Sequence, residues 1–432
     1  MNTRTRPLSL VAFAAGLVSA LGGSPSDVGA QLANASATTL GQGGVAAATV
    51  RGFAALGANP AGLGMPGSGF SLAILPTQFR SGLNPVSLSD LALVEGTILT
   101  DAQRDEWLTE IAANGGQNGY LGLEVSGVSF TVGHFGIQLS TLAGASLNLD
   151  GGLAELVLFG NAGRTGEPRE FTLTDTGADA FAVSTAGVSF AVPFSSDEMA
   201  VAVGATVKYS MGHKMAVVRD QGSVISSDPV AVQVALPVLH TSGASGWLHN
   251  GSGIGLDLGI QMERGDVAMG ASVVNVFNTF AWDATTLTYR AGTASADIGS
   301  ASSDFVEQPV SAAPAAILAS VENLTFDPIL SAGAAVRAGP VLTLSADVRR
   351  RFGEGIHGSR IPRSHAGLGA ELSAGSVLSV QAGAAVITDG DQYSGGVSLG
   401  AGKFNLSVAG AVQRRDLGDT LLGMVAISVG GR

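Results

Sequence analysis

The sequence contains a match to a catalytic motif, the Gly-x-Ser-x-Gly pattern at Gly396–Gly400. In serine hydrolases the pattern forms a sharp turn between a strand and a helix, which exposes the nucleophilic serine. Ser398 instead lies inside an alternating run of apolar and small residues, and no helical pattern follows it. A chain with 62 glycines produces such a match by chance. The sequence therefore indicates that the protein is not an enzyme.

Metal and cofactor chemistry also finds little support in the residue pattern. The histidines do not form pairs with the spacing of metal ligands. They are His134, His213, His240, His249, His357 and His365. The sequence contains no phosphate-binding loop, dinucleotide fingerprint or calcium-loop repeat. We therefore expect no catalytic residue, cofactor or metal site.

Polar residues at alternate positions of apolar runs are the stronger candidates for a function. They are Glu124, Lys208, Asp257, Gln261, Asp347, Glu371 and Gln381. If these runs are membrane strands, a charge that faced the lipid at mid-bilayer would cost about 2–4 kcal/mol, so the polar side chains should point inward. They would then line a polar route or anchor a segment inside a barrel. The alternative is that they only solvate a lumen.

The elements that carry these residues read as β-strands. Between Val341 and Gly430, large apolar residues alternate with small or polar ones. Leu378, Val380 and Val386 share one face of such a run, whereas Ser379 and Gln381 point the other way. A period of two puts one apolar and one polar face on a strand. Short polar breaks separate the runs, which predicts an antiparallel up-and-down meander.

Composition places this meander in a membrane. The chain has 432 residues, 46% hydrophobic and only 13% charged, with a mean hydropathy of +0.35. A soluble domain normally carries about 25% charged residues. After the first thirty positions no apolar run reaches the roughly 18 residues that a membrane helix needs. Closed barrels are the other structures that satisfy their backbone in lipid. The sequence thus predicts a transmembrane β-barrel; the alternative is a large secreted β-sandwich or solenoid.

Fifteen candidate strands can be counted in the sequence. They are 69–79, 121–132, 134–146, 180–192, 199–211, 230–240, 253–262, 267–277, 329–337, 341–348, 368–372, 377–386, 397–401, 404–412 and 421–429. Bacterial single-chain barrels have an even number of strands, so one candidate is wrong or one is missed. The range 230–240 is the weakest because prolines stand at positions 229 and 237. The expected fold is all-β.

Residues 1–30 have the pattern of a secretory signal peptide. Arg4 and Arg6 precede the apolar stretch Leu8–Leu21, and Val28–Ala30 fits a cleavage site. Without Arg4, Arg6 and Asp27, the 22 basic and 34 acidic residues become 20 and 33, a net charge of −13. This acidic balance argues against nucleic-acid binding and fits an exported protein. The chain contains no cysteine, so no disulfide holds the fold.

Residues 31–66 form a segment rich in small side chains before the barrel of residues 67–432. The segment contains Arg51, Phe53, Leu56 and the sequence Asn59-Pro60-Ala61-Gly62-Leu63. With so little bulk it could thread a crowded space such as a barrel lumen, and its apolar side chains could contact a passing ligand. An ordinary N-terminal loop is the alternative.

Three further segments interrupt the strand pattern. Thr100–Asn114 predicts a helix, with Thr100 and Gln103 as a capping box and Gly115 as a stop. Gly151–Asn161 is apolar and fits either a strand or a short helix. Asp283–Thr325 is rich in Ala, Ser and Thr and predicts a long surface loop.

Several of these stretches together resemble a known superfamily. The small-residue segment ending in Asn59–Leu63 after a signal peptide resembles the FadL (long-chain fatty-acid transporter) superfamily of outer-membrane barrels. Later stretches are similar to the PorV-like and related uncharacterised barrels; they are Leu99–Asp101, Leu158–Asn161, Ser252–Gly259, Asn275-Val276 and Trp282-Asp283. The resemblance implies about fourteen strands, a location in the outer membrane and an N-terminal plug in the lumen.

Two functions follow from this resemblance. The first is a PorV-like docking barrel that serves secretion-machinery proteins through its long loops. The second is a passive channel for fatty acids or other hydrophobic small molecules, gated by the N-terminal segment. An apolar tunnel would favour the channel, and a filled lumen with an exposed loop patch would favour the docking barrel. A membrane-bound hydrolase is the remote third possibility.

Overall fold

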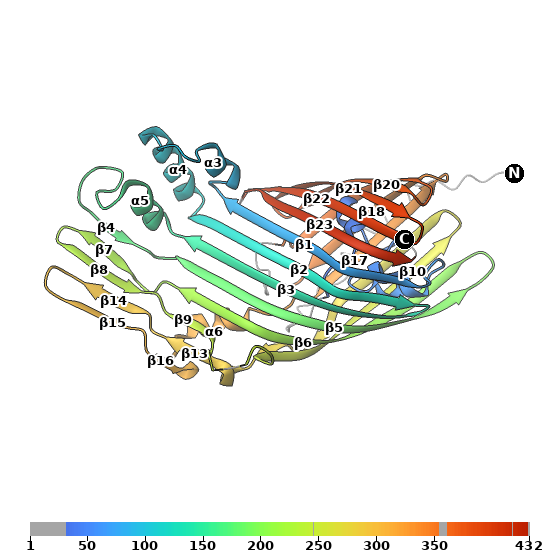
Figure 1. Cartoon of the computed structure of the whole chain (residues 1–432), viewed down its shortest axis with the longest axis horizontal. Helices are drawn as coiled ribbons and strands as arrows, with labels where there is room; N and C mark the ends of the chain where they lie inside the picture. Colours follow the sequence, from blue (N-terminus) through green and yellow to red (C-terminus); the bar gives the residue numbers. More distant parts are fainter. Residues whose placement is uncertain (1–31, 245, 354–360, 417, 431–432) are drawn as a thin grey trace.

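Fourteen long strands form the wall of a closed antiparallel barrel (Figure 1). The computed structural model describes residues 32–244, 246–353, 361–416 and 418–430, so the expected signal peptide lies outside the described residues. The wall strands are β1 (Ser71–Asn84), β2 (Gln117–Val132), β3 (Phe135–Leu149), β5 (Gly177–Ser195), β6 (Ala200–Arg219), β10 (Gly251–Arg264), β11 (Val267–Asn278), β17 (Ile329–Ala338), β18 (Leu342–Arg351), β19 (Ser364–Ala374), β20 (Leu378–Ile387), β21 (Gly390–Ala401), β22 (Phe404–Arg415) and β23 (Thr420–Gly430).

Each wall strand pairs with the next one along the chain, and β23 pairs with β1 to close the ring. Closure leaves no unpaired strand edge to face lipid. The expected up-and-down barrel is therefore confirmed. Of the fifteen candidate strands, the fourteen other than 230–240 lie in the wall. The range 230–240 instead forms two short strands outside the wall, β8 (Val230–Ala235) and β9 (Val238–Thr241).

The alternation of side chains along the wall strands is also confirmed. On β20, Val380 and Val386 are exposed on the outer surface, whereas Ser379 and Gln381 are buried inside the barrel. Leu406 and Val408 on β22 follow the same outward pattern. Burial of one Val or Leu side chain in an apolar phase stabilises a structure by about 1.5–3 kcal/mol, so this apolar surface suits a lipid environment. No helix in the described ranges is long and apolar enough to cross a bilayer.

The two ends of the barrel differ (Figure 1). One end, which we call the short-turn end, carries tight connections such as Gly133-His134 and Gly265-Asp266, together with the first residue of β1 and the last of β23. The opposite, long-loop end carries the connections between β1 and β2, β3 and β5, β6 and β10, and β11 and β17. This asymmetry is typical of outer-membrane barrels.

Three helices cover part of the long-loop end: α3 (Leu88–Leu93), α4 (Asp101–Ala113) and α5 (Gly151–Phe159). The predicted helix at 100–114 is α4, and the ambiguous stretch 151–161 is α5. On α4, Leu108 and Ile111 pack against Ala154 of α5 and against Val86. Thr100 accepts a hydrogen bond from the backbone N–H of Gln103, and the Gln103 side chain returns one to Thr100, as expected.

Replacing Thr100 with alanine should loosen the first turn of α4. Loss of an N-cap side chain costs about 1 kcal/mol of helix stability. Hydrogen exchange of the amide of Gln103 should therefore accelerate by roughly fivefold, whereas Thr109→Ala, on the exposed side of the same helix, should leave that amide unchanged. Equal acceleration in both variants would mean that the cap does not hold this turn.

A five-stranded sheet extends the long-loop end further outward (Figure 1). Its strand order is β15 (Ala301–Asp304), β14 (Thr293–Ala296), β8, β7 (Val224–Ser227) and β4 (Glu170–Thr172). The sheet thus unites the connections between β3 and β5, β6 and β10, and β11 and β17. The connections of this end form one folded layer.

The expected long loop at 283–325 is a folded connection, which corrects the prediction of a plain loop. It contains η3 (Ala284–Thr286), β13 (Leu287–Arg290), β14, β15, β16 (Glu307–Pro309), η4 (Val310–Ala312) and α6 (Ala315–Glu322), and β12 (Ala281–Trp282) precedes it. Ile317 of this connection, together with Phe280 and Phe326 on either side of it, packs in a cluster with Phe181 of β5 and Met215 of β6. This apolar cluster closes part of the barrel at its long-loop end.

Candidate functional site

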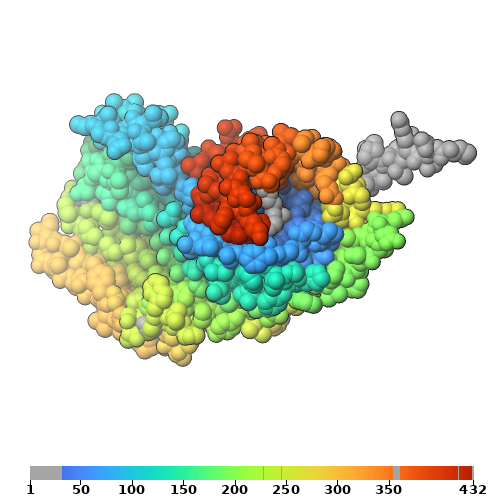
Figure 2. Space-filling model, turned by 45° about the vertical axis from the view of Figure 1, so that its right-hand side comes forward, coloured from blue at the N-terminus to red at the C-terminus, as the bar shows by residue number. Residues whose placement is uncertain are grey.

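Residues 32–66 wind through the inside of the barrel and touch all fourteen wall strands. The segment contains α2 (Ala37–Gly41), η1 (Gly52–Ala55) and η2 (Pro60–Gly64). Figure 2 shows these dark-blue residues inside the opening, between the red C-terminal strands and the yellow and orange wall. Wall residues in contact with it include Ser71, Thr131, Gln138, Gly187, Gly204, Gly259, Ser272, Gly333, Asp347, His365, Gly383, Ser394, Ala409 and Met424.

Glycines on the inner face of the wall let the segment approach the strand backbones. A Cβ atom added at Gly259 would lie 2.0 Å from Asn59 Oδ1, and one at Gly204 would lie 2.4 Å from the Ala61 nitrogen. At Gly270 it would lie 2.0 Å from the Ala47 carbonyl oxygen. These three inward positions of β6, β10 and β11 are therefore glycine because the segment occupies the space of a side chain.

Asn59 is, with Arg51, one of the two most extensively bonded side chains of the segment. Its Nδ2 donates to the carbonyl oxygens of Ala47 at 2.7 Å and Ile260 at 3.1 Å, and its Oδ1 accepts from the Ala61 N–H at 3.2 Å. Asn59 caps η2, and Pro60 stands at the first helical position, where a missing N–H is harmless. The predicted stretch Asn59–Leu63 is thus a fully buried anchor against β5, β6 and β10.

Asp347 of β18 forms the second anchor of the segment. Its Oδ2 accepts hydrogen bonds from the backbone N–H groups of Ala46 at 3.0 Å and Ala47 at 2.8 Å. Both N–H groups lie inside the barrel, where an unpaired donor costs about 1–3 kcal/mol. One carboxylate therefore fixes the middle of the segment to β18.

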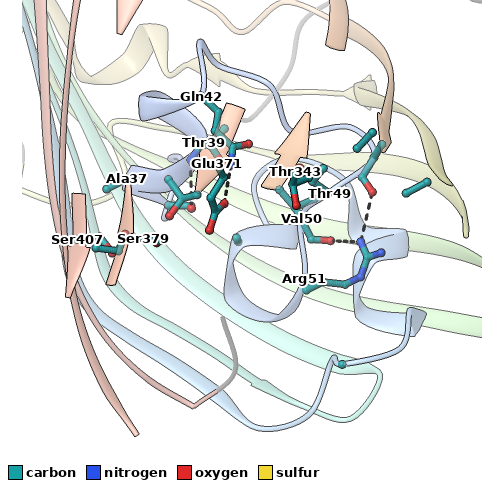
Figure 3. Close-up of a pocket in the computed structure, with 18 of the residues that line it drawn as sticks. Ala37, Thr39, Gln42, Thr49, Val50, Arg51, Thr343, Glu371, Ser379 and Ser407 are labelled. Atoms are coloured by element: carbon teal, nitrogen blue, oxygen red, sulfur yellow. Dashed lines mark hydrogen bonds between the residues drawn. The ribbon is translucent and has the colours of Figure 1, made fainter. Parts of the chain in front are cut away.

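Polar side chains near the short-turn end complete the attachment (Figure 3). Arg51 donates to Gln261 Oε1 at 2.7 Å and forms an ion pair with Glu263 at 3.0 Å. Gln42 Nε2 donates to Glu371 Oε2 at 2.6 Å. These contacts join the segment to β10 and β19.

The apolar candidates of the segment are used mainly for packing. Leu56 and Leu63 are fully buried in a cluster with Val50, Ala55 and Ala191. Phe53 remains half-buried and borders a cavity. Of the three, only Phe53 lines that open space. Gln381, another candidate, is buried beside Gly41 and donates to Ser379.

Lys208 and Asp257 form a buried ion pair on β6 and β10. Lys208 Nζ also donates to Asn275 Oδ1, and the Asn275 N–H donates to Asp257 Oδ1 at 2.7 Å. Asn275 has a φ of 61°, at an irregularity in the register between β10 and β11. Such a bulge redirects a side chain, and here it brings the Asn275 amide to the ion pair. The sequence pointed to Lys208 and Asp257 but missed Asn275.

Two cavities inside the barrel border the segment. The lower cavity, toward the short-turn end, has a volume of about 560 Å³ and is bordered by Arg51, Phe53, Glu263 and Glu371. The upper cavity has a volume of about 160 Å³. Its charged lining residues are Arg80, Glu124, Asp347, Arg349 and Arg351. Both cavities border the segment, so its displacement would join them.

Arg80, Arg349 and Arg351 were not among the candidates from the sequence. Arg351 Nη1 forms an ion pair with Asp327 and donates to the Gly353 carbonyl oxygen at 3.0 Å. All three could have been found by continuing the inward alternation of their strands, since β1 extends to Asn84 and β18 to Arg351. The predicted strands ended at Phe79 and Val348, so these arginines fell into expected loops.

Solved structures with a similar fold come from outer-membrane barrels. The toluene transporter TbuX of Ralstonia pickettii has a TM-score of 0.54 and 14% identity, covering 94% of this chain and 99% of that one. A deletion mutant of the monoaromatic hydrocarbon channel TodX has a TM-score of 0.54 and 11% identity, over 93% and 99%. The monoaromatic hydrocarbon channel CymD has a TM-score of 0.50 and 12% identity, over 92% and 97%. At such identities the likeness shows the fold alone.

These likenesses confirm the resemblance to the FadL superfamily at the level of the fold, and its PorV-like branch stays a prediction. The search of curated proteins found no match. A family model described as a family of unknown function, DUF5723, matches residues 68–300, which are 233 of the 432 residues. Because this match covers more than half of the chain, the protein belongs to the DUF5723 family.

Proposed function

We propose that the protein is a transport barrel of the bacterial outer membrane, in which residues 32–66 act as a movable plug. The observation that carries this proposal is the pair of cavities on either side of a segment attached largely by polar contacts. A segment that served only to fill the lumen would not need a cavity on each side of it. By the usual orientation of such barrels, the short-turn end faces the periplasm and the long loops face outward.

Fold neighbours support transport as the general activity. The solved structures named above are a toluene transporter and monoaromatic hydrocarbon channels. Their hydrophobic substrates are not carried over to this chain by likeness alone. Half of the residues that line the upper cavity are polar or charged, so an apolar solute would have to displace water from them without replacing its hydrogen bonds. A passage for fatty acids or hydrocarbons would need another route.

Asp347→Ala should open the lumen in this proposal. The variant leaves the N–H groups of Ala46 and Ala47 without their acceptor, at about 1–3 kcal/mol each, which favours displacement of the segment by tenfold or more. In planar bilayers its mean conductance should exceed that of the wild type by about tenfold.

Asp347→Asn is the matched control for this experiment. Asparagine removes the charge but keeps an oxygen that can accept from Ala46 and Ala47, so the conductance should stay near that of the wild type. If both variants and the wild type are equally silent, the barrel does not conduct and the transport proposal fails.

A docking platform is the second candidate function. Large apolar side chains are exposed in the folded layer at the long-loop end; they include Trp247, Leu248, Ile298, Phe305 and Val306. Exposed aromatic and aliphatic groups on a rigid layer are typical of protein contacts. A secretion-machinery protein is the partner that the PorV-like resemblance implies. Failure of conductance, with specific co-purification lost in Phe305→Ser, would favour this function.

A further inference from the structure

A third cavity, which we call the outer cavity, lies at the long-loop end of the barrel and has a volume of about 390 Å³. Gln78 and Arg80 of β1 line the upper cavity, and the next residues on the same face, Gly82 and Asn84, line the outer cavity. The two cavities therefore follow each other along the inside of the wall. In the orientation proposed above, a solute that arrives from outside the cell meets the outer cavity first.

Three asparagines in direct register form a row across the outer cavity. Asn84 of β1 pairs with Asn118 of β2, and Asn118 pairs with Asn148 of β3. All three border the cavity. In Figure 1 these strands run side by side toward the helices of the long-loop end. Neighbouring strands lie about 4.8 Å apart, so the row spans roughly 10 Å.

Backbone carbonyl groups fix the orientation of the three amides. Asn84 Nδ2 donates to the Asp419 carbonyl oxygen at 3.1 Å, and Asn148 Nδ2 donates to the Asp175 carbonyl oxygen at 2.7 Å. The Asn118 amide also donates to a backbone carbonyl, at 3.5 Å. None of the three Oδ1 atoms accepts a hydrogen bond from a residue that the structure describes, and Asn148 Oδ1 is buried as well. Buried acceptors normally have a donor, so the row points to donors supplied by a ligand.

The charged groups of the outer cavity do not favour an anion. Arg219 forms an ion pair with Asp179 at 2.7 Å, and Arg415 forms one with Asp389 at 3.9 Å. Asp175, on an exposed turn, adds a further carboxylate to the lining. The neutral acceptors of the row are spread over its length, so they match donors distributed along a ligand better than the single point charge of an ammonium group. Hydroxyl groups both donate and accept, and a carbohydrate carries them along its whole length.

We propose that the outer cavity binds a neutral carbohydrate with at least two sugar rings, which donates hydroxyl groups to the row of Asn84, Asn118 and Asn148. This inference rests on the transport function proposed above, whose substrate class it names. A cavity of about 390 Å³ has room for two rings, because an engineered cavity of about 150 Å³ holds one benzene ring. Tyr120 borders the same cavity and gives the C–H groups of a sugar ring an apolar surface beside its polar tip.

Equilibrium dialysis of the refolded chain with radiolabelled disaccharides tests this inference, in a detergent that has no sugar headgroup. The probes are maltose, cellobiose, lactose and trehalose, which are neutral and have two rings. At least one of them should bind, and Asn118→Leu should weaken its binding by about fivefold, because the row loses one acceptor. Asn118 is exposed, so this variant should keep the unfolding temperature of the wild-type barrel.

Asn118→Asp and Asn323→Leu are the matched controls. Aspartate keeps an oxygen that accepts from a hydroxyl group, so binding should stay within about twofold of the wild type. Asn323 is exposed and does not border the outer cavity, so its replacement should have no effect. Failure of all four disaccharides to bind would overturn the inference, and so would unchanged binding in Asn118→Leu.

A charged probe distinguishes a carbohydrate site from a cation site. Deacetylated chitobiose has the same two-ring scaffold but carries two ammonium groups, and its tighter binding than that of every neutral disaccharide would overturn the assignment to a neutral carbohydrate. Dialysis needs no transport. A barrel that is silent in planar bilayers but binds a disaccharide would therefore reject the transport function alone, and a conducting barrel that binds none would reject this inference alone.

Discussion

Gly259→Ala should displace the Asn59 anchor and open the lumen. The new methyl carbon would lie 2.0 Å from Asn59 Oδ1, whereas ordinary contacts of a Cβ atom begin at about 3.4 Å. Gly259 is on a regular strand that tolerates alanine, so the effect comes from the contact with the segment. Asn59 would lose hydrogen bonds to Ala47 and Ile260, each loss costing about 1–3 kcal/mol.

Trypsin cleavage after Arg51 reports this displacement directly. Arg51 is held against Gln261 and Glu263 in the native lumen, so it should be cleaved slowly in the wild type. In Gly259→Ala, cleavage should accelerate by about tenfold or more. Gly410→Ala is the matched control, since a Cβ there has no neighbour closer than the Leu422 carbonyl oxygen at 3.6 Å. Equal cleavage rates in the three proteins would show that the segment does not depend on this close contact.

Lys208→Met should destabilise the whole barrel by roughly 3–5 kcal/mol, because it leaves a buried carboxylate without its partner. The Lys208 and Asp257 side chains are 0% and 2% exposed, so water cannot compensate the loss. Asn275 would lose the same ammonium group. The temperature at which the folded barrel converts to the slower, unfolded band on an electrophoresis gel should therefore fall clearly.

The double variant Lys208→Met, Asp257→Asn separates charge from packing. With the unpaired carboxylate removed, most of the lost stability should return, because replacing both members of a buried ion pair is often nearly neutral. If the double variant is as unstable as Lys208→Met, the ion pair is not the source of the instability and methionine simply packs badly beneath Asn275.

The barrel itself could be predicted because its physical signal is local. An inward Ser379 or Gln381 next to an outward Val380 repeats every second residue, and each strand needs only its own sequence to show this. Because such barrels have an even number of strands, the count of fifteen candidates indicated an error of one. Pro229 and Pro237 marked 230–240 as the range that lies outside the wall.

The long connection at 283–325 could not be predicted because its core depends on distant partners. Ile317 is buried against β5 and β6, more than a hundred residues earlier in the chain. Between the apolar positions the connection is rich in Ala, Ser and Thr, which has no helical or strand period. Its folding follows from tertiary packing.

For the site, the inward polar residues of the strand centres could be predicted, and those at the strand ends could not. Asp347 and Lys208 lie within alternating runs, so their inward position followed from the period. Arg80 and Arg349 lie just beyond the predicted ends of β1 and β18, where charge suggests a loop. The glycines that receive the segment carry no signal until the segment is placed inside the barrel.

A disulfide tether between the segment and the wall tests whether the segment moves out of the lumen. A Cβ atom at Gly41 would lie 3.0 Å from Gln381 Cβ, so Gly41→Cys with Gln381→Cys joins the segment to β20 after a small shift. The chain has no other cysteine. In the Asp347→Ala background, planar-bilayer conductance should be low in the oxidised protein and rise when the tether is reduced. Equal conductance in both states would show that the segment does not gate the barrel, because the current would not depend on the segment leaving the lumen.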